Sequence, residues 1–325
     1  MGIDNTLIER PPAATARQYP RVAVLIPCHN EAITVGKVVS DFRCRLPDAR
    51  IFVYDNNSTD DTIGVALAAG AEVRSEALQG KGNVIRRMFA DIEADVYVLV
   101  DGDDTYDISS VSLMLDLLHR QRLDMVTGTR LSTQATAFRP GHRLGNRVLT
   151  GTVGWVFGNR VSDMLSGFRV FSRRFVKSFP ALAAGFETET EFTVHALELR
   201  MAVGEVPVAY RDRPDGSASK LHTIRDGLRI LQTIVLLIKE ERPLPFFAAI
   251  GTALLLIGLA LGLPVVVEFL RTGLVPREPT AILATGLVLL SFLSLFGGLI
   301  LDSVAHGRKE MRRLFYLTVR GVDGA

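Results

Sequence analysis

Cysteine is scarce in this chain of 325 residues, and neither sign of charge dominates it. Cys28 and Cys44 are its two cysteines, and neither stands in a CxxC or a cysteine–histidine ligand spacing. This pattern argues against a disulfide framework or a structural zinc site, and it suits a reducing compartment. The formal net charge is only +2, and no basic run is interleaved with aromatic residues. We therefore expect no nucleic acid among the partners.

The first 20 residues contain no apolar run of the kind that forms the core of a signal peptide. They carry several charged residues and three prolines. We therefore interpret residues 1–20 as a flexible polar lead-in, and we expect the domain that follows to stay in the compartment where it is made.

A layered α/β domain is predicted from residue 21 onward, because short β-branched runs alternate there with helical patterns. The expected strands are 22–26, 51–54, 72–74, 96–100 and 125–127, and the expected helices are 31–44, 59–69, 80–92 and 109–119. Polar clusters follow three strands, at 27–31, 55–58 and 101–104. Ligands of open α/β sheets bind beyond the carboxyl ends of the strands, so we expect these clusters to converge.

The C-terminal third of the chain has a different pattern. Apolar residues recur every three or four positions from 221 to 238, while Arg225 and Arg229 fall on another face. This predicts an amphipathic helix at 219–243, which either lies at a membrane interface or packs on the core as an ordinary helix. Two uncharged stretches follow, 246–267 and 281–301. Each is close to the roughly 20 residues that span a bilayer.

The charges around these stretches predict their orientation. The connecting loop has only Arg271 and Arg277 as basic residues, whereas both outer flanks are richer in arginine and lysine. The positive-inside rule then places both termini and the first domain in the cytoplasm, in a multi-pass protein of the cell inner membrane. Gly258 and Gly262 could pack the two spans together or form a homo-oligomer contact. The expected units are a catalytic domain at 21–218, the helix at 219–243, two spans at 244–305 and a basic tail at 306–325.

Asp101 and Asp103 follow the apolar strand 96–100 and are separated by a single glycine. Two carboxylates so placed project from a sheet edge where a ligand can reach them. Hard oxygen ligands of this kind suit Mg²⁺ or Mn²⁺ on a diphosphate. The alternative is a loop in which aspartates merely form turns and caps, but the neighbouring Asp104 adds a third negative charge that favours a cation.

Two further motifs indicate a nucleotide. Asp55 ends its strand and could accept hydrogen bonds from a base or ribose, while residues 56–59 cap the next helix. The stretch 80–83, Gly-Lys-Gly-Asn, opens a helix and brings Lys81 to its N-terminus, where a phosphate could bind. A glycine-rich turn that only starts a helix is the alternative for this second motif.

The order and spacing of these motifs resemble the inverting glycosyltransferases of family 2, which have the GT-A fold. The resemblance rests on the stretches 24–31, 55–62, 80–82 and 101–103. Within that family, Ser-Gly-Phe-Arg at 166–169, the stretch 216–220 and the short pair of spans are similar to the polyprenyl-phosphate glycosyltransferases, relatives of dolichyl-phosphate mannose synthase. The resemblance covers about residues 21–240.

The resemblance implies roles for particular residues. The nucleotide-sugar pocket would be lined by Pro27, Asn30, Glu31, Asp55, Lys81 and Asp101. Asp101 and Asp103 would hold the metal, with Thr105 where the family often has an amide or another polar residue. The acceptor phosphate would be bound by Arg130, Arg143, Arg213 and Lys220, and the residues most directly catalytic would be Asp103, Arg130 and Arg143. Guanidinium groups suit this task because they bind phosphate bidentately.

Two assignments stay open at this point. Arg169 either joins the acceptor-phosphate cluster or braces its own segment through a carboxylate. The acidic run Glu187, Glu189 and Glu191 stands where many family members keep an aspartate general base. A phosphate nucleophile is already ionised near pH 7 and needs no base, so these residues are also consistent with the first turn of a helix, where the macrodipole favours them.

The function that follows is transfer of a sugar from a nucleoside diphosphate sugar, with UDP as the first candidate, to polyprenyl (undecaprenyl) phosphate at the cytoplasmic membrane face. One alternative is a polysaccharide synthase. Against it, the chain has no Gln-x-x-Arg-Trp segment, and its one tryptophan is Trp155. Another alternative is a membrane subunit that binds sugar nucleotides without catalysis.

Overall fold

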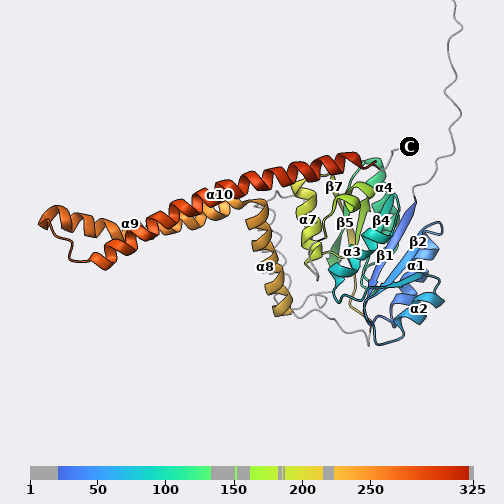
Figure 1. The fold of residues 1–325 in the computed structure, drawn as a ribbon. Coiled ribbons are helices and arrows are strands. Elements are labelled where there is room, and N and C mark those ends of the chain that lie inside the picture. Colours follow the sequence, from blue (N-terminus) through green and yellow to red (C-terminus); the bar gives the residue numbers. More distant parts are fainter. Residues whose placement is uncertain are drawn as a thin grey trace, which may run out of the picture.

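The computed structural model describes residues 21–132, 151, 162–181, 185, 187–214 and 223–321, with the backbone alone for 223–230. A layered α/β domain carries a long helical hairpin that extends away from it (Figure 1). Arg143, Lys220 and Trp155 lie outside the described residues, as does the stretch 216–220.

A mostly parallel sheet forms the centre of the domain. Its seven strands are β1 Val22–Cys28, β2 Arg50–Asp55, β3 Glu72–Ser75, β4 Val96–Leu99, β5 Met125–Ser132, β6 Arg169–Ser172 and β7 Val203–Tyr210. Their spatial order is β3-β2-β1-β4-β6-β5-β7, and among these strands β6 runs antiparallel to both of its neighbours. The five strands expected from the sequence are confirmed. The expected convergence also holds, because β2, β1 and β4 are adjacent and parallel.

Helices cover both faces of the sheet, which explains why the central strands are apolar on both sides. The helices of the domain are α1 Val35–Arg45, α2 Thr62–Ala68, α3 Lys81–Asp91, α4 Val111–Arg120 with the 3₁₀ turn η1 Ile108–Ser110 before it, α6 Arg173–Ser178 and α7 Thr188–Glu198. Alternate residues of β1 serve the two layers: Val24 and Ile26 pack toward α1, α2 and α4, whereas Ala23 and Leu25 pack toward α3, α6 and α7.

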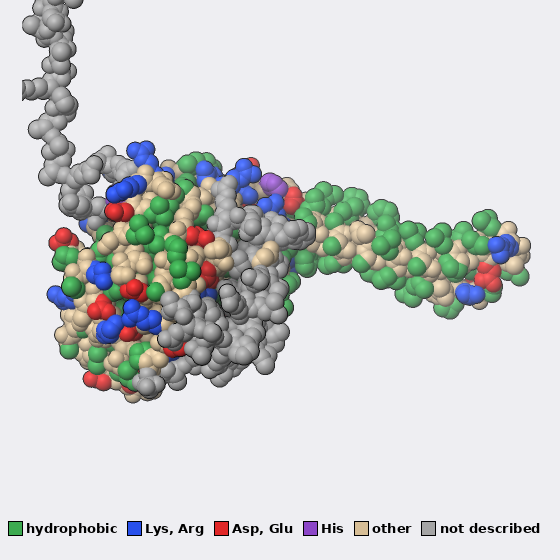
Figure 2. Space-filling model, turned by 180° about the vertical axis from the view of Figure 1, so that it is seen from behind, with side chains coloured by type: hydrophobic (Ala, Val, Ile, Leu, Met, Phe, Trp, Pro, Cys, Tyr) green, Lys and Arg blue, Asp and Glu red, His purple; other side chains and the backbone are tan. Residues whose placement is uncertain are grey.

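The C-terminal region consists of α8 Thr223–Glu241, α9 Pro243–Thr272 and α10 Glu278–Thr318. Helices α9 and α10 are long and apolar enough to cross a membrane. They pack on each other as a hairpin, and hydrophobic side chains are the main colour on its visible surface between the α/β domain and the charged tip (Figure 2). Gly258 faces α10: a Cβ there would lie 3.0 Å from Val288 Cγ2 and 3.2 Å from the Ala284 carbonyl oxygen. The small residues therefore serve the contact between the two helices.

Helix α8 lies across the direction of the hairpin, beside α7 (Figure 1). Ile234 is buried against Val194 and Leu197 of α7, whereas Leu231 and Val235 are about half exposed. One face of α8 is thus packed on the domain, and another presents apolar side chains outward. The packing on α7 confirms contact with the domain, and the position at a membrane interface stays a prediction.

The segment 306–325 begins as a continuation of α10 up to Thr318, with no break in the helix after the apolar stretch. This part of α10 runs along the α/β domain (Figure 1). Its basic residues contact the domain and α8, as described below.

Candidate active site

The two aspartates that follow β4 are held by different cations. Asp103 is 5% exposed; its Oδ1 accepts a hydrogen bond from Thr105 Oγ1 (2.7 Å), and its Oδ2 lies 2.6 Å from a guanidinium nitrogen of Arg213. Arg213 also reaches Glu31, at 3.3 Å. Burial and the negative charge of Asp101 raise the pKa of Asp103. A cation on this carboxylate is therefore electrostatically favoured.

Asp101 pairs with Lys81, at the N-terminus of α3. The Lys81 Nζ lies 2.5 Å from a carboxylate oxygen of Asp101 and 2.5 Å from one of Glu189, the second residue of α7. Burial alone would lower the pKa of Lys81, but the two carboxylates outweigh it and raise the pKa above its usual value. Burial likewise raises the pKa of Glu189, and its second oxygen has no hydrogen-bond partner among the described residues. Glu189 thus belongs to the site.

Glycine separates the two aspartates for a steric reason. A Cβ at Gly102 would lie 2.6 Å from the sulfur of Cys28 on β1. A side chain at Gly167, in the segment before β6, would collide with the carboxylate of Asp101. Close approach of β1, β4 and the 166–169 segment therefore leaves room at these two positions for glycine only.

The loops after β1 and β2 interlock beside the aspartates. Asn30, in a left-handed conformation, accepts a hydrogen bond from the Thr59 backbone N–H (2.6 Å) and donates its own backbone N–H to Ser58 Oγ (2.8 Å). Asp55 accepts a bond from the Ser58 backbone N–H (3.1 Å), while its Oδ1 is buried without a hydrogen-bond partner among the described residues. A buried acceptor of this kind needs a donor, and the N–H of a nucleotide base is one.

Pro27, at the end of β1, lies opposite Tyr54 in the register and is partly buried. It therefore sits on the same edge as Asp55. Of the six residues predicted to line the nucleotide pocket, Pro27 and Asp55 lie at the ends of β1 and β2, and the other four lie on the loops after the strands or at the start of α3.

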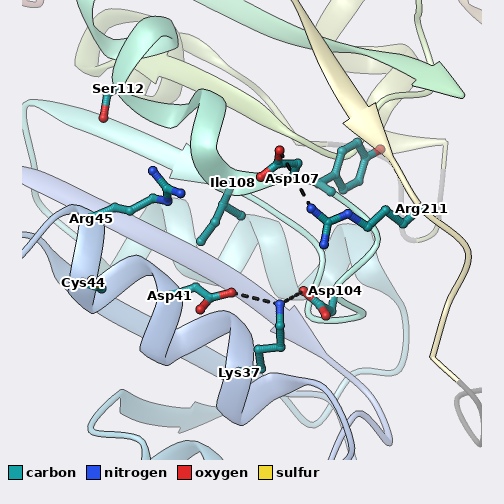
Figure 3. Close-up of a pocket in the computed structure, with 10 residues that line it drawn as sticks. Lys37, Asp41, Cys44, Arg45, Asp104, Asp107, Ile108, Ser112 and Arg211 are labelled. Carbon is teal, nitrogen blue, oxygen red and sulfur yellow. Dashed lines mark hydrogen bonds and ion pairs between the residues drawn. The ribbon is translucent and has the colours of Figure 1, made fainter. Parts of the chain in front are cut away.

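Asp104, the third acidic residue of the cluster, has its own counter-ion. Its left-handed backbone directs the side chain toward α1, where Lys37 Nζ lies 2.7 Å from its carboxylate and 2.9 Å from that of Asp41. These residues line a polar cleft with Arg211 and Asp107 (Figure 3). Cations and carboxylates in this cleft pair with one another, so Asp104 is not part of the Asp101–Asp103 pair.

Arg130, at the end of β5, forms a bidentate ion pair with Asp163, with both N–O distances at 2.7 Å. Its guanidinium also lies 5.6 Å from the ring centre of Tyr210. Tyr106 lies between this pair and the aspartates, because it interacts electrostatically with Arg130 and its hydroxyl accepts a hydrogen bond from the backbone N–H of Gly167, beside Asp101. Asp163 and Tyr106 were not identified from the sequence. No local pattern marks Asp163, which lies 33 residues from its partner.

Arg169 is fully buried, and backbone carbonyls take most of its hydrogen bonds. It donates to the carbonyl oxygens of Met164 (2.5 Å), Ser166 (3.0 Å) and Glu189 (3.2 Å), and also to Thr193 Oγ1. Burial lowers its pKa to about 10. This geometry favours the bracing role for Arg169, with carbonyl groups in place of the expected carboxylate.

The donor set at this edge fits a divalent cation on a diphosphate. Among the residues that the structure describes, no group of three or more His, Cys, Asp or Glu side chains could hold a metal ion. Two carboxylates, Asp101 and Asp103, are what a Mg²⁺-type ion uses when substrate phosphates and water complete its shell. Arg143 and Lys220, predicted to bind the acceptor phosphate, lie outside the described residues.

Comparisons with known proteins agree with this geometry. The sequence profile described as "Glycosyl transferase family 2" matches residues 23–179, which include all three polar clusters. Glycosyltransferase AglJ of Haloferax volcanii is 33% identical over 300 residues, covering 90% of this chain and 97% of that protein. A dolichyl-phosphate hexose transferase of the same organism is 27% identical over 229 residues, covering 70% of this chain and 98% of that protein.

A solved structure shares the architecture. Glucosyl-3-phosphoglycerate synthase from Mycobacterium tuberculosis, in complex with Mn²⁺ and uridine-diphosphate-glucose, has a TM-score of 0.55 and 23% sequence identity. The match covers 68% of this chain and 78% of that one. It shows the fold, which is that of the GT-A glycosyltransferases, as the sequence motifs predicted.

Proposed function

The chain belongs to glycosyltransferase family 2, and from this premise we propose that it transfers a sugar from a nucleoside diphosphate sugar to a polyprenyl phosphate at the membrane. The observation that carries the proposal is the pairing of Asp101 and Asp103 with Lys81 and Arg213 at the edge where β2, β1 and β4 end. The two carboxylates can attract a metal ion, and the two cations on the same edge can attract two phosphates.

The donor side of the reaction uses the loops after β1 and β2. Asp55 would accept an N–H of the base through its buried Oδ1, and the N3–H of uridine is one such donor. Lys81, at the N-terminus of α3, would contact the diphosphate. A Mg²⁺ or Mn²⁺ ion held by Asp101 and Asp103 would stabilise the negative charge that develops on the leaving nucleoside diphosphate. The structurally similar synthase, solved with Mn²⁺ and uridine-diphosphate-glucose, supports the divalent metal ion and the uridine nucleotide.

The acceptor side uses arginines. Arg213 lies within reach of Asp103, and Arg130 lies beside Tyr106, so both are close to where the sugar C1 would be held. A phosphate of the acceptor would bind between them, with Arg143 and Lys220 as further ligands. Its oxygen would then form a bond to C1 as the bond from C1 to the diphosphate oxygen breaks on the opposite face, which inverts C1.

No general base is required in this scheme, because a phosphate monoester is ionised near pH 7. Glu189 then has another role, which is to hold Lys81 together with Asp101. The name of the Haloferax dolichyl-phosphate hexose transferase supports a lipid-phosphate acceptor for this chain.

The hairpin and α8 would bring the site to such an acceptor. Exposed apolar side chains of α8, including Leu231 and Val235, would enter the bilayer interface. Helices α9 and α10 would cross the membrane, with both chain termini and the catalytic domain in the cytoplasm. Contact with a second copy through the spans is compatible with this arrangement.

The test is release of nucleoside diphosphate by purified protein with Mg²⁺ or Mn²⁺, across a panel of donor sugars, with and without undecaprenyl phosphate. Wild type and Asp103→Ala would be compared, with Asp104→Ala as a matched control that removes the carboxylate paired to Lys37. We expect release to need one donor and the lipid, and to disappear only in Asp103→Ala. Nucleoside diphosphate release that does not depend on the lipid but increases with a sugar acceptor would instead identify a glycan-extending transferase.

A further inference from the structure

Helix α10 is longer than a membrane span requires. It has 41 residues, about 60 Å at the helical rise of roughly 1.5 Å per residue. Its uncharged part ends at Leu301, so the remaining residues 302–318 extend about 25 Å beyond the apolar stretch. We call residues 302–318 the strut. It continues the spanning helix without a break and runs along the α/β domain (Figure 1).

Polar contacts attach the strut to α7 and to the segment just after it. Lys309 Nζ lies 3.0 Å from a carboxylate oxygen of Glu198, which is only 4% exposed. One turn further, Arg313 donates a hydrogen bond to the carbonyl oxygen of Leu199 (2.5 Å). These contacts fix the strut against the C-terminal end of α7, the helix whose N-terminal end carries Glu189 at the active site.

The far end of the strut enters the core of the domain. The ring of Tyr316 is 6% exposed and lies in the same hydrophobic cluster as Phe171 and Phe175. Its hydroxyl donates a hydrogen bond to Asp124 Oδ2 (2.7 Å) at the start of β5. The guanidinium of Arg174 lies 4.9 Å from the centre of the ring. Tyr316 is therefore an anchored end of the strut.

A second attachment lies near the membrane. Ile234 of α8 is buried against α7. The end of α8 is tied to the strut by an ion pair between Glu241 and Arg312 (2.8 Å) and by a hydrogen bond from Arg308 to the carbonyl oxygen of Glu240 (2.7 Å). If only the turn at Arg242 joined the domain and α8 to α9, the domain could rotate about the start of α9. Two attachments at separate points of the domain remove this freedom.

We infer that the strut is a positioning element for the reaction: Lys309, Arg313 and Tyr316 hold the catalytic domain at one tilt and height above the bilayer, so that a phosphate carried by a membrane lipid reaches the Asp101–Asp103 edge. This inference rests on the proposed lipid acceptor. It assigns to the basic residues of the strut a structural contact with the domain, in addition to their contribution to membrane orientation.

The test separates positioning from folding by changing the acceptor. A Gly-Ser-Gly insertion after Gly307, where no neighbouring atom lies within 4 Å of a Cβ, would uncouple the docked part of the strut, residues 308–318, from the span and leave its contacts with the domain in place. The same insertion after Gly321, beyond the strut, is the control. A double variant, Lys309→Gln with Tyr316→Phe, weakens the docking and leaves the helix intact.

We expect the insertion after Gly307 to lower kcat/KM for undecaprenyl phosphate in vesicles at least ~10-fold, and that for a short, water-soluble prenyl phosphate by less than about 2-fold. The double variant should also lose more kcat/KM for the lipid than for the soluble acceptor, by a smaller factor. The control should lose kcat/KM for neither acceptor. Equal losses on both acceptors would overturn the inference, because the strut would then only stabilise the domain. No loss on either acceptor would overturn it as well.

A readout without activity keeps this inference separate from the proposed acceptor. Cys44 is exposed and Cys28 is buried, so a dye on Cys44 can report energy transfer to labelled lipid headgroups. We expect one narrow distance distribution for the wild type and the control, and a broad one after the Gly307 insertion. If wild type transferred sugar to no lipid phosphate yet gave this result, the proposed acceptor would fail and the fixed orientation would stand; equal widths would overturn the orientation itself.

Discussion

Asp103 and Asp124 are buried carboxylates at opposite edges of the same sheet, and their partners are chemically alike. Asp103 accepts a hydrogen bond from Thr105 Oγ1 (2.7 Å) and pairs with Arg213. Asp124 accepts bonds from Ser172 Oγ (2.9 Å) and the Tyr316 hydroxyl (2.7 Å) and pairs with Arg174 (3.2 Å). A carboxylate, a hydroxyl and an arginine thus occur at both edges.

The surroundings of these two carboxylates differ. Asp103 has a second carboxylate, Asp101, beside it, and Arg213 is about a quarter exposed on the segment after β7. Asp124 is closed off by the buried ring of Tyr316. Repulsion between neighbouring carboxylates favours an added cation, whereas an aromatic side chain that completes the packing leaves no room for one. The same residue types therefore form the proposed ligand site at one edge and a structural joint at the other.

Removing the cation between Asp101 and Glu189 should have the largest effect. In Lys81→Met the two carboxylates face each other without a counter-ion, so nucleotide-sugar transfer should fall about 10³-fold. Lys37→Met, which removes the exposed partner of Asp104, should change transfer by less than about 3-fold. Initial rates of nucleoside diphosphate release measure both variants. Similar rates for the two would refute the assignment of Lys81 to the donor site.

Arg169, the first residue of β6, lies opposite Leu99 at the end of β4, and its substitution should act on stability. Arg169→Met leaves the carbonyl oxygens of Met164 and Ser166 without their buried donor, which should lower the free energy of unfolding by about 3 kcal/mol. Arg173→Met, which removes an exposed pair with Glu93, should cost less than about 1 kcal/mol. Denaturation in detergent measures both. An unchanged midpoint with a raised KM for the lipid would assign Arg169 to the acceptor instead.

The stability of the side of the domain where Tyr316 docks should depend on pH through His195 of α7. Its Nε2 lies 3.1 Å from Ser178 Oγ between the rings of Phe175 and Phe179, and burial, aided by the charge of Arg312, lowers its pKa to about 3. The unfolded chain then binds the proton first, at its ordinary pKa near 6.5. This part of the stability is present above about pH 6.5 and is lost as the pH falls toward 3, by about 2 kcal/mol between pH 7 and pH 5.

The measurement is the unfolding free energy as a function of pH, compared with His195→Asn. The variant should have a flatter profile in this range because it has no imidazole to protonate. If both proteins lost stability equally, other groups would be responsible for the acid sensitivity.

The smallest effects should come from a matched pair of hydroxyl deletions, which compares the two carboxylates directly. Tyr316→Phe removes the bond to Asp124 and should cost about 1 kcal/mol of stability, with donor affinity unchanged. Thr105→Val removes the bond of equal length to Asp103 and should weaken donor and Mn²⁺ binding about 5-fold. Calorimetry with nucleoside diphosphate measures affinity. Equal effects of the two variants on donor binding would show that the edges do not differ in function.

Much of the fold follows from local sequence. Strands, helices and spans were predicted because each depends on the periodicity or length of an apolar run, and the order of β1, β2 and β4 brings their polar ends together as expected. The metal-ligand candidates Asp101 and Asp103 were predicted for the same reason: a short acidic motif follows a buried strand. Each of these features is encoded in one continuous stretch of sequence, roughly 4–8 residues for a strand and about 20 for a span.

Other features were decided by tertiary structure. Nothing near Glu189 in the sequence distinguishes a helix-start carboxylate from the partner of Lys81, and only the packing of α7 beside α3 brings the two together. The same holds for Arg130 with Asp163, and for Asp124 with Tyr316, which are separated by 192 residues. A local pattern specifies which faces of an element are apolar, but the choice of partner depends on how the layers pack. Sequence therefore determined the elements and the acidic motif, and tertiary packing determined which charges meet and where the long apolar helix α10 docks.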